Sequence, residues 1–404
     1  MEPYSVFKRP VITLLRAVAD RFRLLLNWAL VPLLRHRVWP RSVLHVSYMV
    51  HIPYYTVRLL REHGYRADYL AIGRSSTWDK ADYCFEGSRW RLLRPLFELW
   101  WFWTVMTRYE IIHLHFLITP SATCWELPVL KSLGRKIVAH YRGCEGRDRE
   151  KNMVLHPSMN ICQQCDYNPQ VCNIPLNRIR RDAASHYADL RLVTTPDLLD
   201  FVPSALHFPF FSPLEETLPH RTTRRWPERG RFKIVHATNH PGIEGTEDIL
   251  MVINRLRARG YPIDFVFLRG VSHDRVLGEY ADADLSIGKM KMGYYANAQI
   301  ESLACGVPAV TYVRPEFLTK EIQESGLILA SLENLETVIA DHIDHPEKLE
   351  QKSRAAKTSV GMLHDNGALT RRLVQFYESL NDRRCIAGVR GPTSSLDVSL
   401  SERH

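Results

Sequence analysis

The sequence predicts an α/β protein built from two doubly wound domains. Its 404 residues exceed one ordinary core, because a domain usually holds about 100–200 residues. Short apolar runs alternate with longer amphipathic stretches in two series, which the aperiodic segment 212–231, rich in Pro, Thr and charge, divides. Such alternation indicates parallel sheets covered by helices. We therefore expect two Rossmann-like domains facing each other across a cleft, with ligands at the carboxyl ends of the strands.

The expected elements follow in chain order. In the first series, apolar runs predict strands over residues 42–47, 67–72, 111–115, 136–140 and 190–194, and helices over 53–63, 92–106 and 121–133. In the second series we expect strands over 232–237, 263–268, 285–287 and 309–313, and helices over 246–259, 274–281, 297–305 and 332–343. The boundaries that follow are a basic amphipathic segment (1–41), a first domain (42–212), a linker (213–230), a second domain (231–384) and a disordered tail (385–404).

The composition excludes several classes of protein. Hydrophobic residues make up 45% of the chain and charged residues 24%, which excludes a wholly disordered protein. The net charge of +9 favours an anionic partner, but the excess is concentrated before residue 43 and over residues 221–233 instead of along one face. We therefore expect no nucleic-acid partner. Eight cysteines in so long a chain do not form a disulfide scaffold, so a reduced, cytoplasmic protein is the simplest interpretation.

The N-terminal segment is basic and apolar. Its run Leu24–Leu34 is about half as long as the ~20 residues of a membrane-spanning helix, and it is flanked by Arg23 and Arg35. We expect an amphipathic helix, for which two interpretations stay open. It lies in an anionic membrane interface, which would place the protein peripherally on the inner face of the cell membrane, or it packs on the protein itself.

The second domain contains the strongest motif for function. A strand ending near residue 287 precedes a loop with Lys289 and Lys291, and Asn297 then caps a helix. The N–H groups at the start of this helix and its dipole favour a phosphate, and the groups concerned belong to Ala298 and Gln299. Glu301 lies one turn further on, where its carboxylate can accept hydrogen bonds from ribose hydroxyls. The pattern therefore predicts a nucleotide site; the alternative is a solvated glutamate on an ordinary helix.

The run GYYANAQIESLACGVPAV at residues 293–310 resembles the donor-binding segment of family 4 of the retaining glycosyltransferases (glycosyl transferases group 1), which have the GT-B fold. Segments similar to this family also occur at 234–237, 243–246, 195–199 and 207–209. The resemblance implies a transferase that uses a nucleotide-sugar donor, retains configuration and requires no cofactor. The donor-binding residues that it implies are Gly245, Thr246, Lys289, Lys291, Tyr295, Asn297, Ala298, Gln299 and Glu301.

Two positions depart from the family pattern. Gly293 stands where the family often has a first glutamate, eight positions before Glu301. Glu244 replaces the lysine of a K-G-T motif, and a carboxylate cannot neutralise a diphosphate as that lysine does. His240, Lys289 or Lys291 are candidates to compensate. Either the donor is held differently, or activity is weak or absent.

The first domain supplies the other candidates. Residues 136–149 resemble the family's strand followed by H-G-S-D-x-R, which implies three candidates for catalysis, His140, Arg142 and Glu145. On the acceptor side the candidates are His51, His115, Gly143 and Arg147. His113 and His115 alternate on a strand and so share a face, where lining the cleft or a structural role is preferred over metal binding. The turn at 48–53 lacks the glycines of a dinucleotide site, which argues against a nicotinamide enzyme.

The cysteine cluster at C-x2-C-x6-C predicts a possible structural zinc site. Its members are Cys162, Cys165 and Cys172, with Cys144 upstream. Free thiols, or a disulfide formed in handling, are the alternative, because the paired spacing of a strong zinc motif is absent.

The preferred function is transfer of a sugar from a nucleotide-sugar donor to an acceptor, either a glycan or a lipid-linked intermediate of surface-polysaccharide synthesis. One alternative is a nucleotide-sugar epimerase, which can share the two-domain architecture. Another is a catalytically silent protein that binds a sugar nucleotide or a glycan, which the departures at Gly293 and Glu244 favour.

Overall fold

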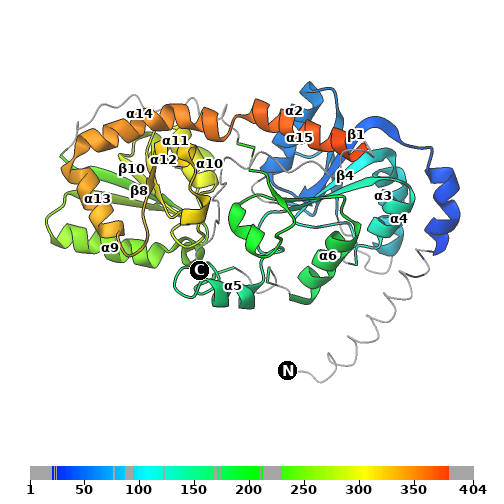
Figure 1. Ribbon diagram of the computed structural model, residues 1–404, viewed down its shortest axis with the longest axis horizontal. Coiled ribbons are helices and arrows are strands. Elements are labelled where there is room, and N and C mark those ends of the chain that lie inside the picture. The colour runs from blue at the N-terminus through cyan, green and yellow to red at the C-terminus, as the bar shows by residue number, and fades with distance from the viewer. Residues whose placement is uncertain are drawn as a thin grey trace, which may run out of the picture.

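The computed structural model describes residues 21, 23, 25–75, 78–86, 94–121, 123–167, 171–172, 174–209, 211–212 and 230–381. Two parallel sheets form its two halves, with strand orders β3-β2-β1-β4-β5-β6-β7 and β12-β11-β10-β8-β9 (Figure 1). The predicted α/β architecture is confirmed. The predicted linker, except for Gly230, lies outside the described residues, as do the predicted tail and residues 1–20.

The first half contains all five predicted strands and two short additional ones. Its strands are β1 (Trp39–Tyr48), β2 (Arg66–Ile72), β3 (Tyr83–Phe85), β4 (Tyr109–His115), β5 (Lys136–Tyr141), β6 (Leu190–Val193) and β7 (Leu206–His207). Its helices are α2 (His51–Glu62), α3 (Arg94–Thr104), α4 (Glu126–Ser132), α5 (Arg149–Leu155) and α6 (Ile174–Tyr187). In β1, Leu44 belongs to the apolar cluster on one face of the sheet and Val43 to the cluster on the other. Burial on both faces explains why the strand is a continuous apolar run.

The second half repeats the arrangement with a smaller sheet. Its strands are β8 (Phe232–Ala237), β9 (Ile263–Leu268), β10 (Leu285–Ile287), β11 (Ala309–Thr311) and β12 (Leu327–Leu329). Its helices are α8 (Pro241–Glu244), α9 (Thr246–Ala258), α10 (His273–Ala281), α11 (Asn297–Ala304), α12 (Lys320–Glu324), α13 (Leu335–Asp344) and α14 (Pro346–Leu363). All pairings in both sheets are parallel, so the carboxyl ends of the strands of each sheet share one edge.

The last described helix returns to the first half of the molecule. Helix α15 (Asn366–Asn381) continues the line of α14 and lies beside α2 (Figure 1). Its Leu373 and Tyr377 are fully buried in one cluster with Val43 and Ile111 of the first sheet. The sequence-based boundary at residue 384 had assigned this helix to the second domain; it packs on the first.

Side chains from the two halves meet directly. Arg314, which follows β11, places its Nη1 atom 2.8 Å from Oδ2 of Asp200 and 2.9 Å from Nε2 of His156. The rings of His207 and Tyr294 lie 5.7 Å apart. These contacts hold one side of the interface closed, and a cleft opens elsewhere along it.

Part of the N-terminal segment is helical and packs on the first domain. Residues 21, 23 and 25–34 form the described part of this N-terminal helix. Asn27 accepts a hydrogen bond from Nε1 of Trp103 in α3 at 2.6 Å, and Arg23 pairs with Glu98 of the same helix at 3.2 Å. The interpretation that this helix packs on the protein itself therefore holds for one face of the helix. Within the described residues, we find no helix with the length and apolar character needed to cross a bilayer.

Candidate functional site

A cleft of about 1310 Å³ lies between the two domains. Four of its lining residues were predicted as site residues: His51 from the first domain and Asn297, Ala298 and Glu301 from the second. The other predicted residues, all within the described chain, do not line it: Gly245, Thr246, Lys289, Lys291, Tyr295, Gln299, His115, His140, Arg142, Gly143, Glu145 and Arg147. The predicted nucleotide motif therefore reaches the cleft through the start of α11.

Helix α11 begins one residue earlier than a cap at Asn297 requires. Ala296 is the residue before the first turn and Asn297 is already helical. The side chain of Gln299 folds back, and its Oε1 accepts a hydrogen bond from the N–H of Ala296 at 3.0 Å. The first N–H groups of a helix have no intrahelical acceptor, so those of Asn297 and Ala298 are available at the cleft wall. Gln299 thus shapes the helix start, and the prediction that Asn297 is the cap is corrected.

Glu301 lies one turn into α11 and meets a histidine that the sequence analysis missed. Its Oε1 atom is 3.2 Å from Nε2 of His273, the first residue of α10. Both residues line the cleft, together with the phenol of Tyr280. Burial, reinforced by the charge of Glu301, raises the pKa of Tyr280 well above its usual value, so this hydroxyl stays protonated and can donate. The Glu301 wall therefore offers one carboxylate, one imidazole and one phenol.

The two lysines proposed to hold a diphosphate are each paired with a carboxylate. Lys289 Nζ forms an ion pair with Glu244, whose second oxygen accepts a hydrogen bond from the Lys289 N–H at 2.7 Å. Lys291 Nζ lies 2.6 Å from Oδ2 of Asp248. His240, the third candidate, has a pKa lowered mainly by burial, so it is neutral at pH 7. The cation that the family supplies at position 244 is thus replaced here by internal ion pairs.

Steric constraints explain why two of the motif positions are occupied by glycine. Gly245 joins α8 to α9 with a φ of 81°, in the left-handed region. Gly293 has a φ of 86°, and a Cβ there would lie 2.7 Å from Cγ of Arg314. A glutamate cannot occupy position 293 while Arg314 holds its contact with Asp200. The first departure from the family pattern is therefore built into the interface between the domains.

Thr246 and Tyr295, two further residues predicted to bind the nucleotide-sugar donor, make contacts within the second domain. Nδ1 of His236 lies 2.7 Å from the carbonyl oxygen of Ile287, which can only accept, so Nδ1 carries the proton. Nε2 of His236 consequently accepts from the hydroxyl of Thr246, at 2.7 Å. Tyr295 is buried, and its ring stacks on that of Tyr294 with the centroids 4.4 Å apart. Thr246 and Tyr295 thus support the loops behind the cleft wall.

In the first domain, the Gly143 loop is organised by two buried acidic side chains. Oε1 of Glu145 accepts hydrogen bonds from the backbone N–H groups of Gly143, at 3.1 Å, and Arg142. Burial raises the pKa of Glu145 although these hydrogen bonds oppose the shift. Arg147 forms a buried ion pair with Asp197 of the segment 195–199, which also resembles the family. Two segments that each resemble the family are thereby joined.

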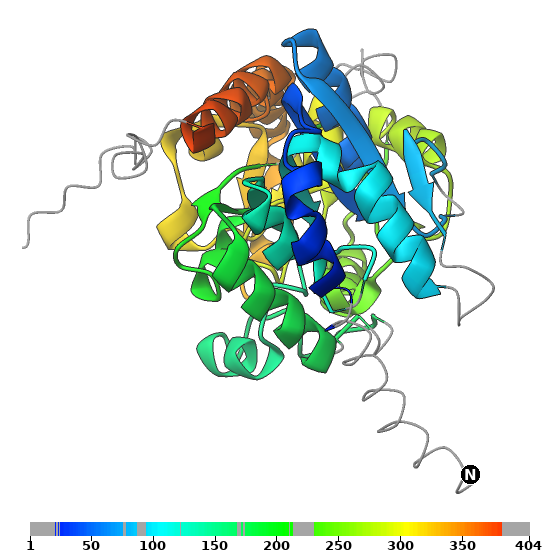
Figure 2. The same cartoon turned by 90° about the vertical axis from the view of Figure 1, so that its right-hand side faces the viewer.

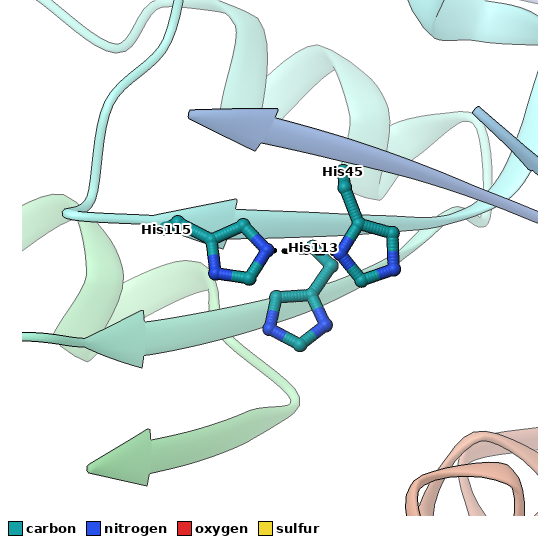
Figure 3. Close-up of side chains that lie close together, drawn as sticks. All are labelled: His45, His113 and His115. Carbon is teal, nitrogen blue, oxygen red and sulfur yellow. Dashed lines mark hydrogen bonds between the residues drawn. The ribbon is translucent and has the colours of Figure 1, made fainter. Parts of the chain in front are cut away.

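A chain of four buried histidines runs through the first sheet. His45 of β1, His113 and His115 of β4, and His140 of β5 lie on one face near the carboxyl ends of their strands (Figure 3 shows the first three). The rings of His113 and His115 are 4.4 Å apart, which confirms that the two share a face. Burial lowers the pKa of His45 to about 3, with a further contribution from Arg142. All four imidazoles are therefore neutral at pH 7.

In the first half of this hydrogen-bonded row of histidines, the protons can be arranged in one way only. Nε of Arg142 can only donate, and it lies 2.8 Å from Nδ1 of His115. The neutral His115 must then carry its proton on Nε2, which donates to Nδ1 of His45 at 2.8 Å. His45 in turn donates from Nε2 to the hydroxyl of Tyr377 at 3.3 Å.

In the second half of the row of histidines, the hydrogen bonds are donated in the same direction. The Tyr377 hydroxyl donates to Nδ1 of His113 at 2.6 Å, and Nε2 of His113 donates to Nδ1 of His140 at 3.1 Å. His140 donates to the hydroxyl of Thr194 at 3.2 Å, and this hydroxyl donates to the Tyr141 carbonyl at 3.2 Å. The chain begins at a group that can only donate and ends at one that can only accept. It therefore fixes each histidine as the Nε2–H tautomer, inside the sheet.

The histidines are also the candidate metal ligands. Ligand atoms of His45, His113 and His115 lie within 4.8 Å of one another, and within the described residues this is the one group of three or more. The donor set does not suit a cation, because both ring nitrogens of each histidine are already hydrogen-bonded and the nearest charge is the guanidinium of Arg142. We interpret the group as a hydrogen-bonded network.

The four cysteines of the predicted zinc site are free thiols in this structure. Burial raises the pKa of Cys144 to about 11, and the nearby sulfurs of Cys172 and Cys162 reinforce the shift. Sγ of Cys162 lies 3.2 Å from Nδ2 of Asn152. The cysteines approach one another without forming a compact group of ligand atoms among the described residues, and the zinc site stays a prediction.

The first-domain wall of the cleft is aromatic, which periodicity did not reveal. Trp78, in the loop after β2, lies 6.1 Å from the ring of His51 and 6.0 Å from that of Tyr55. All three residues line the cleft opposite Glu301. Aromatic faces bind the apolar faces of ring-shaped ligands. Sequence reasoning found His51 alone, because Trp78 lies in an irregular loop.

No protein-family model and no curated protein sequence matches the chain. Solved structures do match its fold. Sucrose-phosphate synthase from Thermosynechococcus elongatus aligns with a TM-score of 0.55 and 12% identity over 84% of this chain and 99% of that one. HepE from Anabaena, in complex with UDP and glucose, aligns at 0.56 and 10% identity, over 84% and 99%. The catalytic domain of starch synthase IV from Arabidopsis thaliana, bound to ADP and acarbose, aligns at 0.54 and 10% identity, over 85% and 100%.

These likenesses and the two facing sheets define the class: the chain has the GT-B fold, and its structural neighbours are GT-B glycosyltransferases. HepE is also known in complex with UDP-glucose, so the neighbours' complexes contain UDP, UDP-glucose or ADP. At about 10% identity the likeness establishes the architecture alone.

Proposed function

We propose that this protein is a glycosyltransferase that moves a sugar from a nucleotide-sugar donor to an acceptor, with retention of configuration. One observation carries the proposal: Glu301 and the first turn of α11 open together onto a cleft that both domains line. The N–H groups of Asn297 and Ala298 suit a diphosphate, and the Glu301 carboxylate suits two neighbouring ribose hydroxyls. The aromatic wall opposite suits the acceptor.

In the proposed reaction, the enzyme stabilises the departing nucleoside diphosphate. The helix start is fixed in advance by Gln299, so its N–H groups meet the developing charge without rearrangement. The acceptor is a glycan or a lipid-linked intermediate of surface-polysaccharide synthesis, reached from the cytoplasmic side, as the resemblance and the basic N-terminus favour. No metal ion or cofactor is assigned a step.

A second candidate function is a catalytically silent protein that binds a sugar nucleotide. The pairing of Lys289 with Glu244 and of Lys291 with Asp248 favours it, because the two lysines that the resemblance assigns to the diphosphate are already neutralised by carboxylates. Turnover separates the two candidates: a silent protein binds the donor and releases no product.

The test of the proposed site is Glu301→Gln, with Glu347→Gln as the matched control on the exposed surface of α14. UDP, ADP and their glucose conjugates are the probes, read by thermal shift and calorimetry, since a ligand that binds only the folded state raises the melting temperature. We expect the wild type and Glu347→Gln to bind one of the probes. Glu301→Gln should bind it at least about tenfold more weakly, as loss of a hydrogen bond to a charged group requires. Equal binding by both variants would refute the assignment.

The chemical step is tested with the donor that binds. Release of free nucleoside diphosphate with a glycosylated acceptor supports transfer, and the anomeric configuration of the product tests retention. A donor isomerised in the absence of any acceptor would instead identify an epimerase.

A further inference from the structure

Two neighbouring helices of the first domain each expose large apolar side chains. On the N-terminal helix these are Leu25, Trp28 and Leu33, exposed by 73%, 68% and 72%. On α3 they are Leu96, Phe97 and Trp100, exposed by 61%, 44% and 54%. Isolated exposed apolar residues are normal on a protein surface, whereas a group of six on two touching helices marks an interaction site. We call these six residues the docking face.

The two helices form one rigid surface. Asn27 and Arg23 of the first contact Trp103 and Glu98 of the second, and these contacts lie on the faces turned toward each other and the core. Leu30 and Val31 pack against the same core cluster as Leu99 of α3. Figure 2 shows the two helices next to each other on the side that faces the viewer. Each helix is therefore held by its inner face, and its outer face stays apolar and exposed.

The exposed charges on the two helices of the docking face and at their ends have one sign. Arg21, Arg35 and Arg37 are exposed at the ends of the N-terminal helix, and Arg94 is exposed at the start of α3. Residues 21–37 contain no acidic residue, and the one acid of α3, Glu98, is buried between Arg23 and Arg94. An apolar surface with two tryptophans, bordered by arginines and without an exposed carboxylate among the described residues of its two helices, complements anionic lipid headgroups over an acyl layer.

We propose that the docking face binds the surface of an anionic lipid bilayer. The inference goes beyond the proposed sugar transfer and does not depend on it. It also extends the sequence-based expectation, which concerned the N-terminal segment alone: α3 supplies half of the face, and the N-terminal helix stays packed on the domain while it binds. Each arginine near a negatively charged surface strengthens attachment, and the six apolar side chains enter the interface without spanning it.

The experiment is co-sedimentation of the full chain with vesicles of phosphatidylcholine alone or mixed with phosphatidylglycerol. The test variant is Trp28→Ser/Leu33→Ser/Phe97→Ser/Trp100→Ser. Its matched control, Met251→Ser/Met362→Ser, removes exposed apolar side chains of α9 and α14 in the other domain. We expect the wild type and the control to bind mixed vesicles, the test variant to bind at least about tenfold more weakly, and salt to weaken binding.

A second variant, Arg35→Glu/Arg37→Glu, keeps the test decisive if the serine variant does not fold, as judged by circular dichroism. It should lose binding to mixed vesicles by a similar factor. The proposal would be overturned if the wild type failed to bind mixed vesicles or bound neutral and mixed vesicles equally. It would also be overturned if the folded variants bound as well as the wild type. Concentration-dependent self-association that the serine variant abolishes, without vesicle binding, would show that a second copy of the chain covers the face. Because no donor or acceptor is involved, these outcomes are independent of the proposed transferase activity.

Discussion

The hydroxyl of Tyr377 on α15 lies 2.6 Å from Nδ1 of His113 and is the middle link between the two halves of the histidine chain. Residue 377 belongs to the last helix, 264 positions after His113, and the contact fixes both the docking of that helix and the tautomers of the sheet histidines. Arg142, beside the Gly143 loop, is the first link. The orientation of a predicted catalytic residue therefore depends on the end of the described chain.

Removal of this link should destabilise the protein. Tyr377→Phe leaves Nδ1 of His113 without its donor and Nε2–H of His45 without its acceptor, both fully buried. Each unsatisfied buried group costs about 1–3 kcal/mol, so we expect the free energy of unfolding in urea to fall by at least ~2 kcal/mol. Tyr65→Phe is the control, because Tyr65 packs 5.7 Å from the Tyr377 ring. Equal stability of Tyr377→Phe and wild type would refute the directed chain.

The same histidines should make the protein sensitive to acid. Their pKa values in the folded state are lowered, that of His45 to about 3, whereas the unfolded chain titrates near 6.5. Stability is therefore fully present above pH 6.5 and is lost as the pH falls from there toward the lowered values, because only the unfolded state takes up protons. Each neutral histidine makes the free energy of unfolding fall by about 1.4 kcal/mol for each pH unit of acidification in this range.

Other buried groups alter the size of this effect. Burial raises the pKa of Glu126 to about 7, which has the opposite sign and offsets one histidine, and Glu145 acts in the same direction. Burial lowers the pKa of His207 to about 4 and also lowers that of His236, and these two add to the acid effect. We expect a net loss of stability between pH 7 and pH 5, measured as the urea midpoint. A midpoint that is constant or rises over this range would contradict the neutral chain.

The strands were the most predictable part of the fold. The strands β8, β9 and β10 have the bounds expected from sequence, because each is a short, largely apolar run bounded by turn residues. The return of α15 could not be predicted, since the apolar stripe that contains Leu373 and Tyr377 says that the helix is buried but not against which domain. Local periodicity carries no information on contacts between distant segments.

The candidate site was predictable mainly on one wall, since His51 was the one residue expected on the other. The start of α11 and Glu301 form a contiguous motif, and they reach the cleft. Trp78 and His273 lie in or next to irregular loops, where spacing gives no signal. The sequence contained an indication of the pairing of Glu244 with Lys289, because an acidic residue replaces the lysine expected at position 244 and a lysine follows the neighbouring strand. Only the structure shows that the two charges meet.

This pair should control affinity for nucleoside diphosphates. Glu244→Gln frees the ammonium of Lys289 while an amide oxygen can still accept from the Lys289 N–H. We expect UDP or ADP to bind about three- to tenfold more tightly, since one cation is then available to the anion. Calorimetry is the measurement, and Glu247→Gln, an exposed neighbour, is the matched control. Weaker binding by Glu244→Gln would mean that the intact ion pair shapes the site and that Lys289 is not a masked phosphate ligand.

Position 293 should reject any side chain. Gly293 combines a φ of 86° with a Cβ position 2.7 Å from Cγ of Arg314, so Gly293→Ala must both strain the backbone and displace an arginine that joins the domains. We expect a loss of about 1–3 kcal/mol in unfolding free energy, measured in urea. Gly278→Ala is the control, because Gly278 lies inside α10 with nothing within 4 Å of its Cβ position, and it should be neutral or stabilising by about 0.5–1 kcal/mol. Adding Arg314→Ala to Gly293→Ala should recover the steric part of the loss but not the backbone part. If Gly293→Ala were as stable as wild type, the interface would not be what excludes the family's first glutamate, and the reason for this departure would have to be sought in the donor.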